Sequence, residues 1–289
     1  MIAFGHSIIY DYQPSNQPNQ ELPSIIVQEG KTQTYDHHID YDQNQNRKVS
    51  LSTDGAFIDN VSHQKWAFNI EDLVCFNWEK SSSILYYDLQ PNIPFHLLEY
   101  WLLHTLLPIY LTIEGKNDLI HAGSVEIDKR AVLFIAPSFG GKSTLTNYFI
   151  GQGHPMISDD RVGLQNKNNK IHCTSSYPYH RPYRKMEDLG KKVEKFTSED
   201  KELFCIYLLE GVDAKDNIDF TRLKGIDSFK ALQYNFDFNL PLNKARSFEL
   251  IGKIAAQVPI YKLSIPWDLE RLSEVYDKVC QHCTQGTHL

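Results

Sequence analysis

A glycine-rich stretch, followed by a lysine and two hydroxyl side chains, is the segment of this sequence whose chemistry is easiest to interpret. It begins at Ala136 and ends at Thr144. Its spacing fits the Walker A pattern, Gly-x4-Gly-Lys-Ser/Thr, except that Ala136 replaces the first glycine. Such a loop can turn tightly because glycines permit unusual backbone angles, and its N–H groups can then bind phosphate oxygens.

The flanking sequence favours this interpretation over a simple turn. The apolar run 131–135 predicts a buried strand before the loop, and a helical pattern begins at Lys142. We therefore predict a site for a nucleoside triphosphate, with ATP as the expected ligand, in which Lys142 contacts the phosphates and Ser143 offers a hydroxyl to Mg²⁺. The alternative is a Gly-Gly turn before a capped helix, with Lys142 in solvent. The residues expected to bind the nucleotide are Ser138, Gly140, Gly141, Lys142, Ser143 and Thr144.

Two adjacent carboxylates, Asp159 and Asp160, lie 17 and 18 residues after Lys142. They follow the short run 155–158, which predicts a strand, and the strand ends of such sheets border the ligand crevice. Because neighbouring side chains of an extended chain point in opposite directions, one carboxylate can face a metal ion and the other an acceptor hydroxyl. The alternative is a solvated turn, since aspartates are common in turns.

The elements around these residues predict an α/β core. The pattern indicates strands at 119–127, 131–135, 155–158, 203–209 and 258–265, and helices at 142–150, at 227–234 and from Asp268 onward. Alternation of strands with helices is typical of an α/β domain.

The N-terminal third has a different character. Short β-prone runs at 24–27, 55–58 and 83–87 alternate with polar turns and predict a β-rich lobe. An apolar helix is expected after Pro94, and Pro108 should end or kink it. We therefore predict two domains: a β-rich accessory lobe at 1–92 and a P-loop catalytic domain at 93–289.

Composition excludes several classes of function. The chain has 289 residues and a formal net charge of −7, which argues against general binding to nucleic acid. The N-terminus lacks the basic and apolar regions of a secretory signal, and the hydrophobic stretch 95–113 contains His96, Glu99 and His104, which disfavour a membrane span. Five widely spaced cysteines suit reduced thiols. We expect a cytoplasmic protein that binds neither nucleic acid nor membranes.

The stretch from His121 to Val162 resembles the catalytic core of the HPr serine kinase/phosphorylase family. The matching features are His121 followed by a small residue and a strand, Lys142 with Ser143, and the segment Gly-His-Pro-Met-Ile-Ser-Asp-Asp-Arg-Val at 153–162. The resemblance implies a mixed-sheet P-loop kinase core similar to the nucleotide domain of phosphoenolpyruvate carboxykinase.

The resemblance also implies roles for individual residues. The catalytic residues would be Asp160, His121, Lys142 and Asp159, with Asp160 as the base that accepts the proton of a serine hydroxyl and His121 as its partner. Lys142 would contact the phosphates, while Ser143 and Asp159 would hold Mg²⁺.

The sequence departs from the family pattern at several places. Ala136 and Phe139 stand where the family usually has glycine, and Thr144 stands where glutamate is usual. No Arg-Gly-Leu-Gly segment follows Asp160, so we do not expect phosphorolysis. The chain resembles more closely the branch that includes lasso-peptide precursor kinases.

The expected function is an ATP- and Mg²⁺-dependent kinase that phosphorylates a serine of a protein or peptide. The alternatives are a nucleotide-binding regulatory or assembly module without turnover, and a small-molecule kinase that acts on free serine. Homo-oligomerisation is left open.

A cationic and aromatic segment, 177–185, follows the aspartates. Arg181 and Arg184 could bind a phosphate or an acidic peptide, because the guanidinium fork matches such oxygens. The alternative is a solvated loop. Two other groupings are weaker: the histidines of 35–40 are expected on the surface, and 280–283 is expected at a helix end rather than in a zinc site.

Overall fold

The computed structural model describes residues 1–12, 21–41, 47–57, 65–181, 185–238 and 240–285. The chain forms two compact units. The first comprises Met1–Lys116, Arg184–Leu189 and Phe238–Ala245, and the second comprises Asn117–Tyr183, Gly190–Asp237 and Arg246–Leu289. The first unit thus takes in residues 93–116, which the sequence analysis assigned to the catalytic domain; the functional division at residue 92 stays a prediction.

An eight-stranded sheet makes up most of the first unit. Its order is β1-β2-β3-β8-β7-β6-β5-β4, with β3 parallel to both β2 and β8 and the other pairs antiparallel. The strands are β1 (Ile2–Ala3), β2 (His6–Tyr10), β3 (Ser24–Glu29), β4 (His37–Tyr41), β5 (Val49–Thr53), β6 (Lys65–Ile70), β7 (Val74–Glu79) and β8 (Ile84–Leu89).

The strands expected at 24–27 and 83–87 are present, as β3 and β8. In β3, Ile25 and Val27 are fully buried while their neighbours are less so, which is the alternation that a strand with one buried face requires. The strand expected at 55–58 is wrong for the described residues 55–57, because the chain bends at Asp54 and Gly55; residue 58 lies outside the described ranges.

The helical segment of this unit passes through Pro108 without ending there. It consists of α1 (Phe95–Trp101), the π-helical η1 (Leu102–Leu106) and α2 (Leu107–Ile113). A proline ring within an α-helix collides with the carbonyl four residues earlier, which here belongs to His104. The wider π-helical turn around His104 relieves this conflict, so the helix continues to Ile113. The short η2 (Pro241–Asn243) completes the described helices of this unit.

The second unit contains a nine-stranded mixed sheet, so the α/β class expected from the sequence is confirmed. The main path runs β12-β10-β11-β17-β14-β13-β9, and β19 pairs with both β17 and β18. Only the β11–β17 and β17–β19 pairs are parallel. The strands are β9 (Asp118–His121), β10 (Gly123–Ile127), β11 (Arg130–Ile135), β12 (Met156–Ser158), β13 (Arg161–Lys167), β14 (Lys170–Thr174), β17 (Lys201–Val212), β18 (Phe220–Arg222) and β19 (Ile260–Pro266), with β15 (Tyr179–His180) and β16 (Lys191–Lys192) forming a separate pair.

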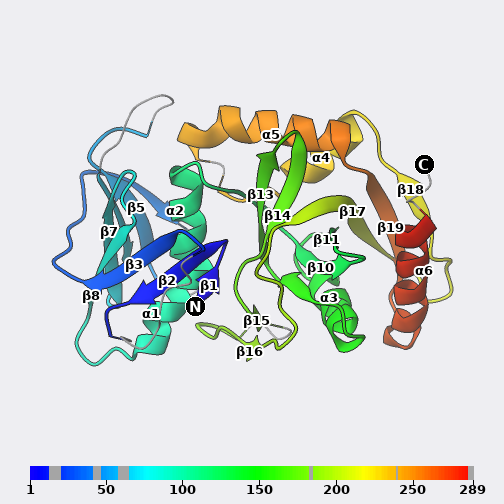
Figure 1. Ribbon diagram of the computed structural model, residues 1–289, viewed down its shortest axis with the longest axis horizontal. Helices are drawn as coiled ribbons and strands as arrows, with labels where there is room; N and C mark the ends of the chain where they lie inside the picture. Colours follow the sequence, from blue (N-terminus) through cyan, green and yellow to red (C-terminus); the bar gives the residue numbers. More distant parts are fainter. Residues whose placement is uncertain (13–20, 42–46, 58–64, 182–184, 239, 286–289) are drawn as a thin grey trace. The chain divides into compact units, whose positions relative to one another are not determined.

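Helices cover both faces of this sheet (Figure 1). One face packs against α3 (Lys142–Gly151) and α6 (Leu272–Gln285), and the other packs against α4 (Ile226–Gln233) and α5 (Lys244–Gln257). Strand β11 shows why both faces need a cover. Its Leu133 and Ile135 belong to one hydrophobic core, and its Val132 and Phe134 belong to the other. A run of consecutive apolar residues is therefore buried on both sides, as in an interior strand of a layered α/β domain.

Two pairs of consecutive strands change partners at one place, which we call the sheet corner (residues 121–123 and 158–161). Strands β9 and β10 are separated only by Ala122, and β12 and β13 only by Asp159 and Asp160. Strand β9 pairs with β13, whereas β10 pairs with β12 and β11. The Ala122 amide donates to the Asp160 carbonyl over 3.1 Å, so both chains turn together.

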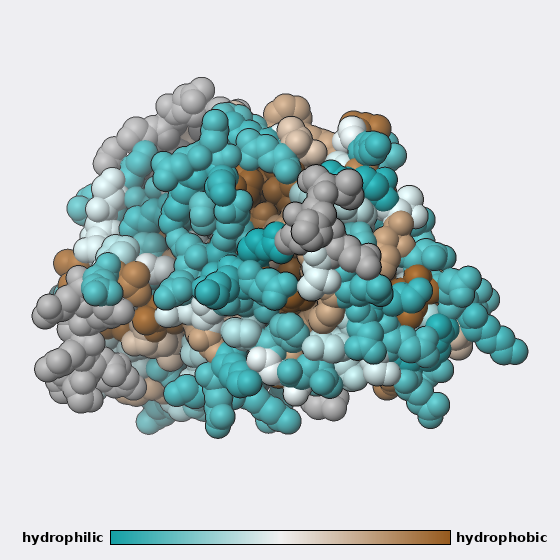
Figure 2. Space-filling model, turned by 45° about the vertical axis from the view of Figure 1, so that its right-hand side comes forward, coloured by the Kyte–Doolittle hydropathy of each residue, from teal (hydrophilic) through white to brown (hydrophobic). Residues whose placement is uncertain are grey.

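No helix among the described residues has the length and apolar character needed to cross a membrane. The face drawn in Figure 2 is covered mainly by hydrophilic residues, with apolar residues confined to separate patches.

Candidate functional site

The glycine-rich loop connects β11 to α3, as the sequence predicted. Two of its positions require glycine for different reasons: Gly141 has a φ of +86°, and a Cβ on Gly140 would lie 2.7 Å from the Cβ of Ala136. Ala136 itself is buried in the core at the end of β11 and keeps an ordinary negative φ, so the missing first glycine is tolerated. Phe139 takes a positive φ of 63° and is 87% exposed.

Lys142 is buried against this loop, with 4% of its surface exposed. Its Nζ donates to the carbonyl oxygens of Ala136, at 2.7 Å, and Pro137, at 3.2 Å. The ammonium therefore lies under the loop, where phosphate oxygens could replace these carbonyls as its partners. Ser143, one residue further along, is half-buried, while Thr144 and Ser138 are exposed.

Gly123 allows α3 to approach the sheet. A Cβ at this position would lie 2.1 Å from Oγ1 of Thr146 and 3.5 Å from the carbonyl oxygen of Lys142. The first turn of α3, including Lys142, therefore lies directly against β10. The absence of a side chain at Gly123 sets the position of the lysine relative to the sheet corner.

The two aspartates lie at the same edge of the sheet as the loop. Strands β11 and β12 are each antiparallel to β10 and hence run in the same direction, so their carboxyl ends meet at one edge. The loop follows β11, and Asp159 and Asp160 follow β12. His121 reaches this edge from β9, because its register partner in β13 is Arg161.

Asp160 is the centre of a charged network at the corner. Its Oδ1 lies 3.2 Å from Nδ1 of His121, and its Oδ2 lies 3.1 Å from Nη1 of Arg161. The Arg161 Nε also donates to Oδ2 of Asp237 over 2.7 Å. These partners hold the Asp160 carboxylate in place, while a quarter of the side chain stays exposed.

His121 is shifted towards its neutral form. Burial lowers its pKa, the negative charge of Asp160 raises it, and the positive charge of Lys142 lowers it again, with a net lowering from the ordinary value. The effect of Lys142 shows that this lysine and His121 share one electrostatic environment. Neutral imidazole can donate one proton to Asp160 and keep its other nitrogen as an acceptor.

Asp159 points to different partners from Asp160 and is almost fully buried. Its Oδ2 accepts a hydrogen bond from the backbone amide of Arg181 over 2.7 Å and lies 2.9 Å from Nδ1 of His180, although that second contact lacks hydrogen-bond geometry. Its Oδ1 is buried and has no hydrogen-bond partner among the described residues. A buried carboxylate oxygen of this kind calls for a ligand, such as water or a cation.

The Ser143 hydroxyl and the buried Oδ1 of Asp159 are oxygen ligands of the kind that Mg²⁺ prefers. This ion usually takes one or two protein groups together with phosphates and waters. Within the described ranges, no three His, Cys, Asp or Glu side chains cluster closely enough to hold a metal ion by themselves. An ion between Ser143 and Asp159 would therefore depend on the nucleotide for the rest of its ligands.

The predicted site residues thus gather at one sheet edge, and their chemical roles stay predictions. Arg181 contributes its backbone amide to the site, while Arg184 lies outside the described residues. Sequence reasoning missed His180 and Asp237. His180 belongs to the cationic segment singled out above, so its type gave a signal, but nothing in the sequence connects Asp237 to Arg161.

The weaker groupings have structural explanations. His37 and His38 are exposed, as expected. In α6, His282 Nδ1 lies 2.8 Å from the Tyr207 hydroxyl and its ring stacks on Phe220, while Cys283 is buried beneath them. These packing contacts explain why His282 and Cys283 occur together in this segment.

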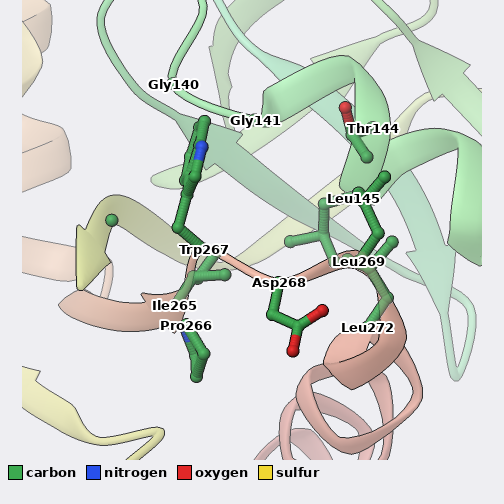
Figure 3. A pocket seen from close by; sticks show the side chains of 11 residues that line it. Gly140, Gly141, Thr144, Leu145, Ile265, Pro266, Trp267, Asp268, Leu269 and Leu272 are labelled. Atoms are coloured by element: carbon green, nitrogen blue, oxygen red, sulfur yellow. The ribbon is translucent and has the colours of Figure 1, made fainter. Parts of the chain in front are cut away.

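A pocket of about 290 Å³ adjoins the glycine-rich loop (Figure 3). The loop and α3 provide one side of it, and the segment between β19 and α6 provides the other. The lining residues are Gly140, Gly141, Thr144, Leu145, Gly211, Ile265, Pro266, Trp267, Asp268, Leu269 and Leu272.

Comparison with solved structures finds similarity that is distant. The chain is similar to the HPr(Ser) kinase/phosphatase from Coxiella burnetii, with a TM-score of 0.39 and 16% sequence identity, over 58% of this chain and 92% of that one. No protein-family model matches the sequence, and no curated protein matches it either. A similarity this distant gives no ground for assigning an activity, which has to follow from the residues of the site.

Proposed function

We propose that this protein is an ATP- and Mg²⁺-dependent kinase that transfers the γ-phosphoryl group to a serine hydroxyl of a protein or peptide. The observation that carries the proposal is the meeting of three groups at one sheet edge: the loop with Lys142, the Asp160–His121 pair, and the buried Asp159. Phosphoryl transfer needs these elements, because it depends on holding the phosphates, neutralising their charge and orienting the acceptor.

Each residue then has a defined task. The loop amides and Lys142 bind the β- and γ-phosphate oxygens. Ser143 and Asp159 hold Mg²⁺, which neutralises charge on the phosphates when bound. The serine oxygen bonds to the γ-phosphorus, the bond to the β–γ bridging oxygen breaks, and the hydroxyl proton passes to the Asp160 carboxylate. ADP leaves, and the product is a phosphoserine.

His121 supports this role of Asp160. Because its lowered pKa leaves the imidazole neutral at physiological pH, it orients the carboxylate without adding a full positive charge to compete for the proton. Arg161 anchors the other carboxylate oxygen. The acceptor hydroxyl would approach the exposed part of Asp160.

The test is transfer of radiolabelled γ-phosphate from ATP to HPr, to serine-containing peptides and to free serine. We expect Lys142→Ala and Asp160→Asn each to lower transfer by about 100-fold or more, the usual contribution of a charge-stabilising group or a general base. Lys142→Ala should also weaken ATP binding in calorimetry, whereas Asp160→Asn should not. Lys215→Ala and Asp219→Asn change exposed residues of a surface loop and serve as matched controls.

A second function has one observation in its favour. The Lys142 ammonium is bonded to its own loop, an arrangement that would also suit a nucleotide-binding module without turnover. ATP binding without label transfer to any acceptor or to water would favour that module. Unchanged binding and transfer in both site variants would contradict the kinase proposal.

A further inference from the structure

The pocket beside the glycine-rich loop has the composition of a site for a planar, uncharged group. Apolar side chains dominate its walls, and Asp268 is its one charged residue. A carboxylate repels phosphate but accepts hydrogen bonds from ring N–H or amino groups. The pocket therefore does not suit the phosphate end of a nucleotide and does suit the base end.

Trp267 forms one wall of this pocket and lies against the loop. Figure 3 shows its indole beside Gly140 and Gly141, with Leu145 and Leu272 across the pocket. The ring atom Cζ3 lies 3.8 Å from the position that a Cβ on Gly141 would occupy, which is ordinary van der Waals contact. A flat ring inserted here would have the indole on one side and aliphatic side chains on the other.

The protein holds Trp267 in an exposed position. The side chain is 63% exposed, and its neighbour Leu269 is 73% exposed. The absence of a side chain at Gly211 makes room for the indole, since a Cβ there would lie 3.0 Å from Cε3 of Trp267. Two large apolar side chains kept in solvent at the mouth of a pocket are typical of a ligand site rather than of core packing.

The segment that carries Trp267 is fixed by hydrogen bonds. Its backbone amide donates to Val212 over 2.9 Å, and Asp268 Oδ1 accepts from the amide of Glu270 over 2.9 Å. Arg271 Nη1 donates to the carbonyls of Ala214, at 2.7 Å, and Asp216, at 2.8 Å. The wall is thus organised before any ligand arrives, which lowers the entropic cost of binding.

We infer that this pocket binds the base of the nucleoside triphosphate, with a purine ring stacked on Trp267. The inference rests on the proposed function, because the loop that would hold the phosphates supplies Gly140, Gly141 and Thr144 to the pocket. A nucleotide whose phosphates lie on the loop amides would reach this pocket with its other end.

Tryptophan fluorescence offers a direct test. The chain has four tryptophans, and the other three, Trp66, Trp78 and Trp101, are at most 2% exposed. Acrylamide quenching of the intact protein therefore reports mainly on Trp267. ATP should protect this residue from acrylamide, while inorganic tripolyphosphate, which has no base, should leave it exposed.

Variants make the test independent of the fluorescence signal. Trp267→Ala should weaken ATP binding by about tenfold or more, the usual loss of one base-stacking contact, without changing tripolyphosphate binding. Trp267→Phe should restore most of the ATP affinity. Tyr234→Ala removes another highly exposed aromatic ring of this unit and should have no effect.

The outcomes separate the two proposals. If ATP and tripolyphosphate both bind but Trp267 stays accessible and Trp267→Ala binds ATP normally, the base pocket is wrong and the phosphate site stands. If neither ligand binds, both proposals are wrong.

Discussion

Gly123→Ala tests whether the close packing of α3 on β10 positions Lys142. The added Cβ would lie 2.1 Å from Oγ1 of Thr146, and real Cβ atoms essentially never approach another heavy atom within 3.0 Å. Thr146 is fully buried, so its hydroxyl cannot swing into solvent, and the first turn of α3 has to shift instead. Overpacking of this kind costs about 1–3 kcal/mol of the unfolding free energy.

The shift should also affect function. A displacement of Lys142 on the order of 1 Å can lower the rate of a positioned reaction by about 100-fold. We therefore expect Gly123→Ala to lose the proposed transfer activity beyond what its reduced stability explains. Urea unfolding followed by circular dichroism measures the stability, and the radiolabel assay measures the transfer under conditions where the variant is folded.

A double-mutant cycle isolates the cause. The Thr146 hydroxyl has no hydrogen-bond partner among the described residues, so Thr146→Ala alone should change the unfolding free energy by about 1 kcal/mol or less. In Gly123→Ala/Thr146→Ala the new methyl takes the space of the lost Thr146 hydroxyl, and most of the stability and activity should return. Gly252→Ala is the matched control, because nothing lies within 4 Å of its Cβ position in α5 and it should stabilise the protein slightly.

Two results would refute this reasoning. One is a Gly123→Ala protein as stable and as active as the wild type. The other is a cycle in which the two substitutions simply add, since contacting residues in one strained site should show a coupling of about 0.5–3 kcal/mol.

Three further predictions concern the charged residues. Because burial lowers the pKa of His121, the unfolded chain binds its proton more readily. The stability that neutral His121 contributes is present above the unfolded pKa of about 6.5 and is lost as pH falls from there through the lowered pKa of the folded state. His121→Asn should flatten the fall in unfolding free energy between about pH 7 and pH 5; an unchanged urea-unfolding profile would contradict this. Arg161→Met removes the partner of two carboxylates and should cost about 2–3 kcal/mol in urea unfolding, whereas Arg222→Met, an exposed control, should cost little. His180→Asn should raise the Mg²⁺ concentration needed for half-maximal transfer by about tenfold, because His180 borders Asp159; an unchanged requirement would rule out this supporting role.

The part of the fold that the sequence predicts well is local. The strand before the loop and the helix after it were expected at 131–135 and 142–150, and they occur as Arg130–Ile135 and Lys142–Gly151. Each is defined by neighbouring residues: an apolar run, two glycines and a helical pattern. The aspartate pair is equally local, since it directly follows a short strand.

The features that the sequence does not reveal depend on distant pairing. One continuous strand was expected at 119–127, but it breaks at Ala122 because its two halves pair with different strands. Asp237 meets Arg161 across 76 residues of chain. Trp267 joins the glycine-rich loop only because α3 and α6 pack on the same face of the sheet. These contacts cannot be predicted from the local residue pattern, because they form only when the sheet assembles.

The strand expected at 55–58 is wrong for the described residues 55–57 for a related reason. Its residues are β-prone, but the polar turn at Asp54 and Gly55 takes the chain out of the sheet after β5. Strand β5 pairs with β4 and with β6, and Trp66 and Phe68 of β6 pair with Trp78 and Phe76 of β7. Cross-strand pairs of aromatic side chains stabilise the strands that contain them.

Opening of the sheet corner can be followed by hydrogen–deuterium exchange. Where the two chains turn, the Ala122 amide donates its proton to the carbonyl of Asp160. Its rate of exchange with deuterium measures how often the corner opens. A ligand that draws the loop and the aspartates together should slow that exchange, while amides at the far ends of β13 and β14 keep their rates.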